Sequence, residues 1–284
     1  MIKKFFSYYR PHMGLFIIDM ICAFLVAVCN LFFPFVTGNI ISVYIPDKRL
    51  DLVLVWCGVL LFVYVFKAFL AYVIQYWGHV MGVRIQGDMR RDFFHHIELL
   101  PFSYFDNNKT GAIMSRIVND LFEISELAHH GPEDLFLSAI TLVGALVLIA
   151  LINPWLALIV AAIVPFMCWF AVVQRRKQKA AFARMREETG EINAEAESAI
   201  SGIRVSKAYT AEKHEIAKFD VANCNYQEAR SRAYKSMGVF NSGMGLFTDV
   251  LYLVALLAGG LFFYYNMIDV GQLTSYILYV TMIT

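Results

Sequence analysis

Two pairs of adjacent histidines come nearest in this chain to the spacing that metal chemistry needs. His129 and His130 lie directly before residues 131–134, which read Gly-Pro-Glu-Asp, so imidazoles and carboxylates are close in sequence. Both groups are ordinary zinc ligands. Neighbouring side chains on an α-helix point ~100° apart, however, because the helix has 3.6 residues per turn. We therefore predict a kinked helix with polar residues and no metal site here, and the same for His95 and His96.

The remaining reactive residue types indicate no catalytic centre. The five cysteines show no CxxC spacing, and four of them lie in apolar stretches, where cysteine acts as a small hydrophobic residue. The glycine-rich loop G-x4-GK[ST], which binds nucleotide phosphates, does not occur. We predict no catalytic residues, no bound cofactor and no disulfide in these 284 residues.

Three ionisable residues lie inside apolar stretches, where a charge is costly and usually functional. Asp19 and Asp249 lie about one turn inside the end of their stretch, and both side chains can lean toward water there. Lys67 follows Leu52 by 15 residues, or ~22 Å of helix, and its side chain leans away from the nearer water. We predict that Lys67 faces a wet cavity or pairs with Asp19 or Asp249. These three residues are candidates for the substrate cavity or for a conformational switch.

The apolar stretches themselves predict an all-α membrane protein, a six-span helical bundle. Hydrophobic residues make up 59% of the chain and charged residues 17%, against about 45–50% and 25% in soluble domains. The apolar runs approach the ~20 residues that cross ~30 Å of hydrocarbon. The first run is too long for a signal peptide and is expected to be retained. We predict spans at about residues 13–36, 52–83, 133–152, 155–175, 240–265 and 271–284. The last is too short to cross a bilayer, so we expect the natural polypeptide to continue.

Two polar segments, residues 84–131 and 174–238, carry most of the charge. All but three of the 24 lysines and arginines lie in these segments or at the N-terminus. The positive-inside rule places all three regions in the cytosol. We therefore predict a multi-pass protein of the cell membrane with a cytoplasmic N-terminus. The first arm (84–131) and the second arm (174–238) are predicted to be helices that leave the bilayer and return.

Each arm should turn at its far end. Pro101 should end the descending helix of the first arm, because proline removes a hydrogen bond and clashes inside a helix. Gly202 interrupts the polar helix of the second arm, and Gly111 and Gly202 are expected to permit a tight backbone. Arg116 and Asp120 lie four residues apart and can pair with each other.

Both arm tips resemble signature segments of one family. Residues 105–120 read FDNNKTGAIMSRIVND, which is similar to the FD-x4-G-x-[IL]-x-SR-x3-D segment in the first intracellular loop of ABC exporters. Residues 201–219 read SGIRVSKAYTAEKHEIAKF, which resembles the GIR-x-VKAF-x2-E-x2-E-x3-F segment of the second loop. Ser206 and Tyr209 stand where the family commonly has Val and Phe. With the order of spans and arms, the resemblance covers essentially the whole chain.

The resemblance implies the transmembrane domain of an ABC exporter (type IV ABC transporter), a half-transporter whose nucleotide-binding domain is fused downstream or is a separate chain. It implies a second transmembrane half in a homo- or heterodimer, and ATP and Mg²⁺ bound by the nucleotide-binding domains, which make the full transporter an ATPase. The substrate would be a small molecule, lipid or peptide that crosses the lipid bilayer, and no nucleic acid is expected as partner. The residues implied to couple the tips to those domains are Phe105, Asp106, Gly111, Ser115, Arg116, Asp120, Gly202, Arg204, Lys207, Tyr209 and Glu212.

Three other readings compete with an exporter. A voltage-gated channel would need repeated arginines within a span, and residues 155–173 contain none. A secondary transporter with inverted repeats shows helices broken near the midplane and does not need two long polar arms. The third reading is a membrane receptor or regulatory subunit on the same fold, whose activity ATP only modulates. The sequence does not distinguish this reading from an exporter.

Overall fold

The computed structural model describes residues 2–108 and 110–284, and every regular element within these ranges is a helix. The predicted all-α fold is therefore confirmed for the described residues. Contacts divide the chain into two compact units, residues 1–157 with 258–284 and residues 158–257.

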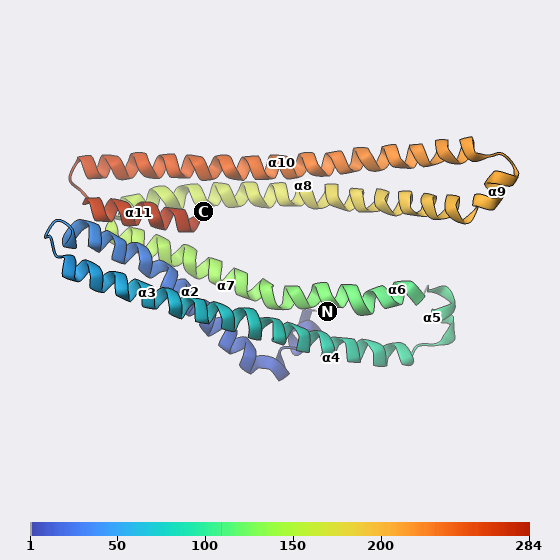
Figure 1. Ribbon diagram of the computed structural model, residues 1–284, viewed down its shortest axis with the longest axis horizontal. Coiled ribbons are helices and arrows are strands. Elements are labelled where there is room, and N and C mark those ends of the chain that lie inside the picture. Colours follow the sequence, from blue (N-terminus) through green and yellow to red (C-terminus); the bar gives the residue numbers. More distant parts are fainter. Residues whose placement is uncertain (1, 109) are drawn as a thin grey trace. The chain divides into compact units, whose positions relative to one another are not determined.

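The first unit contains the N-terminal helices, the first arm and the C-terminal helix (Figure 1). Its helices are α1 (Ile2–Ser7), η1 (Arg10–His12), α2 (Met13–Asn39), η2 (Ile40–Tyr44), α3 (Leu50–Val73), η3 (Ile74–Gly78), α4 (His79–Glu98), α5 (Phe102–Asn107), α6 (Thr110–Ser115), η4 (Arg116–Asp120), α7 (Leu121–Ile152) and α11 (Val270–Ile283).

Proline positions explain several boundaries of the first unit. The helix that starts at Leu50 runs on through η3 and α4 for 49 residues and ends at Glu98, shortly before Pro101, as predicted. The segment Phe102–Asn107 forms the short helix α5 at the tip of the first arm, and the backbone becomes extended at Asn108. Pro132 lies inside α7, which continues through it without a break.

The core of the first unit lies where α2 packs against α3, η3, α7 and α11. Small and medium apolar side chains of α2, such as Ala23 and Val26, contact Leu70 of α3 and Ile74 of η3. Near the N-terminus, the buried Tyr9 donates a hydrogen bond from its hydroxyl to the Ala128 carbonyl of α7, at 2.7 Å. This contact ties the start of the chain to the first arm.

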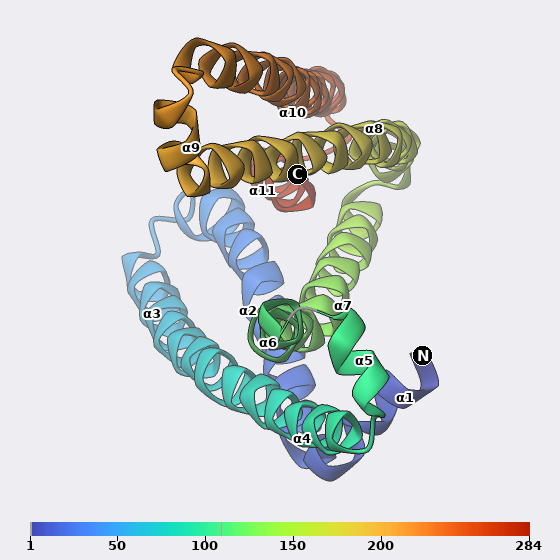
Figure 2. The same cartoon turned by 90° about the vertical axis from the view of Figure 1, so that its right-hand side faces the viewer.

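The second unit is an antiparallel pair formed by long parts of α8 (Pro154–Ser201) and α10 (Glu212–Tyr264), joined by α9 (Ile203–Ala208). Figure 2 shows α9 crossing from one long helix to the other. An ion pair of 2.7 Å joins Lys218 Nζ to Glu195 Oε1 across the pair. Nearer the apolar part, the Phe170 and Phe247 rings lie 5.2 Å apart. Arg184 and Glu188 form an i,i+4 ion pair on α8.

Five helical stretches of the described chain are long and apolar enough to cross a membrane. They are Lys4–Tyr44, Leu50–Glu98, Ile113–Ile152, Pro154–Ser201 and Glu212–Tyr264. The helix α11 is apolar but has only 14 residues. Large apolar side chains on these helices are exposed, as lipid contact requires; Phe62 of α3 is 70% exposed and Leu151 of α7 is 77% exposed. The predicted count of six spans stays a prediction.

Candidate functional site

The tip of the first arm presents aromatic side chains to solvent. The short helix α5 links α4 to α6, and its first residue, Phe102, is 89% exposed. Phe105 and Asp106 are also exposed, and the Phe105 ring packs edge-on against Tyr104 with centroids 5.6 Å apart. An apolar ring held in water costs free energy, so an exposed aromatic tip favours a surface that another protein covers.

The ascending side of the first tip carries the remaining predicted residues of that arm. Ser115 ends α6, and Arg116 and Asp120 bound η4, a stretch of π-helix. All three side chains are exposed. The possible Arg116–Asp120 ion pair does not form in the structure, although both residues are described. The Arg116 side chain is therefore exposed and forms no ion pair with a described residue.

The tip of the second arm has the same character. Tyr209, directly after α9, is 81% exposed, and Val205 is 62% exposed. Arg204, Lys207 and Glu212 are exposed around them. The tip therefore combines apolar, aromatic and charged side chains on one short helix and its flanks, which is the composition expected of a docking surface.

The expected reason for glycine at the tips is wrong. No described glycine has a positive φ, and a Cβ at Gly111 would meet nothing within 4 Å. Gly202 lies between α8 and α9 at φ −86°, which other residues also adopt, although a Cβ there would lie 3.2 Å from the Ser198 carbonyl oxygen. The left-handed position of the second tip is Thr210, with φ 53°.

The three ionisable residues predicted inside apolar stretches belong to two different units, Asp19 and Lys67 to the first and Asp249 to the second. Asp249 is exposed and belongs to the second unit, whereas Lys67 is half-buried in the first. Lys67 forms no ion pair with any described residue, and it lies near enough to Cys29 of α2 to interact with that side chain electrostatically. Cys29 is ten residues from Asp19 on α2, or ~15 Å along the helix.

Asp19 does not lean toward water as predicted. Its side chain is buried, and Oδ2 lies 3.6 Å from Nδ1 of His129 on α7. The prediction failed because it considered the direction of the Asp19 side chain on its own helix and not the helix packed against it. The contact between α2 and α7 covers the carboxylate.

The histidines at 129 and 130 converge despite their expected ~100° offset. Their ring centroids lie 4.7 Å apart, and the ring of His79 from α4 lies 4.8 Å from that of His129. Glu133, one turn further along α7, places Oε2 3.4 Å from Nε2 of His129. The sequence already placed Glu133 beside these histidines, four residues after His129, but no spacing in the sequence indicated that His79 joins them.

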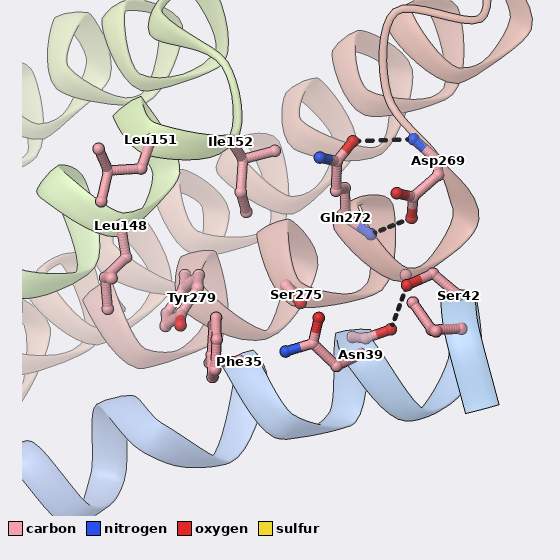
Figure 3. Close-up of a pocket in the computed structure, with 13 residues that line it drawn as sticks. Phe35, Asn39, Ser42, Leu148, Leu151, Ile152, Asp269, Gln272, Ser275 and Tyr279 are labelled. Atoms are coloured by element: carbon pink, nitrogen blue, oxygen red, sulfur yellow. Dashed lines mark hydrogen bonds between the residues drawn. The ribbon is translucent and has the colours of Figure 1, made fainter.

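A cavity of about 320 Å³ lies among the ends of α2, α7 and α11 (Figure 3). One wall is apolar, formed by Leu148, Leu151 and Ile152 of α7. Opposite lie polar groups of α2 and α11, including Asn39 and Gln272. Gln272 is held in place by a capping box, because its backbone N–H donates to Asp269 Oδ1 at 2.8 Å and its Oε1 accepts from the Asp269 N–H.

Long apolar helices that continue into two helical arms with exposed tips define the transmembrane part of a membrane transport protein. Residues 16–284 match the family described as the ABC transporter transmembrane region. The chain belongs to this family, which confirms the resemblance found in the arm tips.

Proteins similar in sequence to this chain agree with the family assignment. The uncharacterized ABC transporter ATP-binding protein YwjA of Bacillus subtilis is 35% identical over 278 residues, which are 98% of this chain and 48% of that protein. The ATP-dependent lipid A-core flippase of Thiobacillus denitrificans is 24% identical over 76% of this chain and 37% of its own length. The probable multidrug resistance ABC transporter ATP-binding/permease protein YheH of Bacillus subtilis is 30% identical over 56% of this chain and 24% of its own length. The chain spans about half the length of relatives such as YwjA.

Proposed function

We propose that this chain is the substrate-translocation domain of an ATP-driven exporter and that its two arm tips dock onto nucleotide-binding domains. The observation that carries the proposal is the exposed aromatic and charged composition of both tips, at positions that match the family's loop motifs. The coupling residues are the eleven named from the sequence, with Tyr209 as the principal contact of the second tip.

Helix continuity supports a mechanical role for the arms. The helix α8 runs for 48 residues and α10 for 53, and each includes both an apolar and a polar part. A continuous helix resists bending, so a displacement of α9 moves the apolar parts of both helices. In the proposed mechanism, ATP and Mg²⁺ bind in the nucleotide-binding domains, and ATP binding and hydrolysis switch the bundle between inward- and outward-facing states.

The proposed setting is a dimer in the cell membrane, with the N-terminus and both arms in the cytosol. The partner is a second transmembrane half, identical or related. The cargo is a small molecule, lipid or peptide, and the exposed apolar surfaces suit an apolar or amphipathic one. The name of the lipid A-core flippase supports such a cargo by analogy alone. Lys67 and Asp249 remain our candidates for the substrate cavity or the switch.

A receptor or regulatory subunit on the same fold is the second candidate function. Its arms would also dock onto nucleotide-binding domains, but no cargo would cross the membrane. ATP-dependent movement of a substrate by the full-length protein distinguishes the two.

Replacement of Tyr209 tests the proposal. We expect Tyr209→Ala, in the full-length protein in inverted membrane vesicles, to lower ATP-driven accumulation of a hydrophobic fluorescent dye by about tenfold or more, since buried tyrosines at interfaces often contribute 2 kcal/mol or more. ATP hydrolysis should persist, no longer coupled to transport. Tyr234→Ala is the matched control, because Tyr234 is exposed on the same arm but away from its tip. Unchanged transport and dye-stimulated hydrolysis in Tyr209→Ala would refute the role of Tyr209.

A further inference from the structure

Three helices of the first unit bring five metal-ligating side chains together. We name this group the histidine–carboxylate cluster; it consists of Asp19 from α2, His79 from α4, and His129, His130 and Glu133 from α7. One nitrogen from each imidazole lies within 4.8 Å of the other two. Atoms of Asp19, His129 and Glu133 likewise lie within 4.8 Å of one another. The two sets share His129, which makes it the centre of the cluster.

The core of the cluster is buried and has no hydrogen-bond partners. Asp19 is 1% exposed, His129 2% and Glu133 8%. Both oxygens of Asp19, both ring nitrogens of His129 and Oε2 of Glu133 form no hydrogen bond with any described residue. Buried polar groups almost always have partners, because an unmet donor or acceptor costs ~1–3 kcal/mol. Five such atoms in one place indicate either that an ion or molecule binds between these side chains or that the side chains adopt another arrangement.

The distances within the cluster fit an ion shared between the side chains. His129 Nε2 lies 3.4 Å from Glu133 Oε2, and His130 Nδ1 lies 3.7 Å from the same oxygen. N–H···O hydrogen bonds are ~2.7–3.2 Å long, so these contacts exceed that range. Two ligands that each lie ~2.0–2.1 Å from a tetrahedral zinc ion are ~3.3–3.4 Å apart. The His129–Glu133 distance therefore matches that between two ligands of one ion, and the other members lie within 4.8 Å, close enough to reach the same ion by small side-chain rotations.

The charge of the histidine–carboxylate cluster also favours a bound cation. The cluster holds two buried carboxylates, and no described lysine or arginine forms an ion pair with either. Buried negative charge needs a cation close by. His129, which lies between Asp19 and Glu133, could supply at most a single positive charge against these two carboxylates. A divalent cation balances both carboxylates.

Neighbouring groups orient the histidines for binding. His79 Nδ1 lies 2.7 Å from the Gln75 carbonyl oxygen, so this nitrogen carries the proton and Nε2 is free to ligate. Nδ1 of His129 faces Asp19, while its Nε2 faces Glu133. A carboxylate or carbonyl on the second ring nitrogen is the usual support of a metal-bound histidine.

The backbone leaves room for this arrangement at Gly78. A Cβ at Gly78 would lie 1.9 Å from the His129 Cε1, so only glycine admits the ring. Gly78 ends η3, a π-helical stretch directly before His79, and such stretches often occur at functional sites. The side chains of His130 and Glu126 are 39% and 43% exposed, so the cluster opens to solvent on that side.

We propose that the histidine–carboxylate cluster binds one divalent transition-metal ion of the zinc type, through His79, His129, His130 and Glu133, with Asp19 orienting His129. Mixed nitrogen and oxygen donors suit zinc and cobalt, whereas Mg²⁺ prefers oxygen ligands alone. The bound ion links α2, through Asp19, to α4 and α7, and so holds these three helices together.

Direct metal binding tests this site independently of transport. The full-length protein, purified in detergent with a histidine-free affinity tag, is stripped with EDTA and dialysed against Zn²⁺, Co²⁺ or Mg²⁺. Bound metal is measured by mass spectrometry, and Co²⁺ is also followed by its visible absorption, which is strong in tetrahedral sites. We expect Zn²⁺ and Co²⁺ to bind and to raise the Tm, and Mg²⁺ to do neither at this site.

Substitutions assign the metal to the cluster. His129→Gln, His79→Gln and Glu133→Gln should each remove the Co²⁺ absorption and about one zinc ion per chain, whereas Asp19→Asn should weaken zinc affinity by about 10–100-fold. His95→Gln, an exposed histidine on the same α4 helix, is the matched control and should bind as the original protein does. If His129→Gln does not fold, metal binding by His79→Gln and Glu133→Gln decides whether the ion is bound at the cluster. Absence of Zn²⁺ binding by the folded protein, or equal binding by these variants, overturns the proposal.

Discussion

At the scale of single residues, Ser206 is a position where this chain departs from the family pattern. Its side chain is buried in the second tip, beside a cavity lined by Ile203, Ile216 and Phe219. Its hydroxyl forms no hydrogen bond with a described residue. The family commonly has Val here, which would place methyl groups in the same apolar surroundings.

We expect Ser206→Val to stabilise the second arm by about 1 kcal/mol, because it removes an unpaired buried hydroxyl and adds apolar contact. The measurement is the free energy of unfolding, or the Tm, of the full-length protein in detergent. Ser201→Val is the control, since Ser201 is exposed at the end of α8. A lower Tm for Ser206→Val would show that the hydroxyl is satisfied and that our account of this residue is wrong.

At the scale of helices, close contact between α2 and α11 depends on two glycines. A Cβ at Gly271 would lie 2.1 Å from the Gly38 carbonyl oxygen, and one at Gly38 would lie 2.0 Å from Ser275 Oγ. Ser275 Oγ donates a hydrogen bond of 2.8 Å to the Pro34 carbonyl of α2, and the approach makes this bond possible. Small residues are the usual means by which membrane helices pack closely.

Gly271→Ala should therefore push α11 away from α2 and cost about 1–3 kcal/mol. A lower Tm of the purified protein is the expected readout. Gly260→Ala provides the comparison, because a Cβ at Gly260 would meet nothing within 4 Å. If both variants unfold at the same temperature as the original protein, the glycine contact does not set the position of α11.

Local sequence features predict where the helices begin and end, but not which helices pack together. Proline and glycine interrupt helices locally, so the end of α4 before Pro101 and the break between α8 and α9 at Gly202 were predictable. The long helices were predictable from the lengths of the apolar runs, because run length is also a local property of the sequence. Contacts between helices were not predictable. The pairing of Asp19 with His129 and the approach of His79 depend on which helices pack together, and no local spacing encodes that choice.

At the scale of the whole molecule, the distribution of charge predicts the orientation in the membrane. Lysine and arginine gather in the arms, so both arms should lie in the cytosol. Cys224 of α10 is exposed in the second arm and reports on this directly.

A membrane-impermeant maleimide should label Cys224 in inverted vesicles, where the cytosolic face is outside, and not in intact cells, where the reagent cannot reach that face. Only a thiol in contact with water reacts, because the thiolate is the reactive form. Cys57 and Cys168 are exposed on apolar helices and should react little. Cys224→Ser should abolish the label and thereby identify its site. Labelling of Cys224 in intact cells would reverse the proposed topology.

The central claim is that the arm tips dock onto nucleotide-binding domains, and photo-cross-linking from position 209 tests it most directly. Tyr209 is replaced by a photoreactive phenylalanine analogue in the full-length protein in native membranes, and the linked peptides are identified by mass spectrometry. The same analogue at Tyr234 is the control. We predict cross-links from position 209 to a nucleotide-binding domain, with a yield that changes when ATP is added, and none from position 234. Cross-links from position 209 only to lipid or to other proteins would contradict the account.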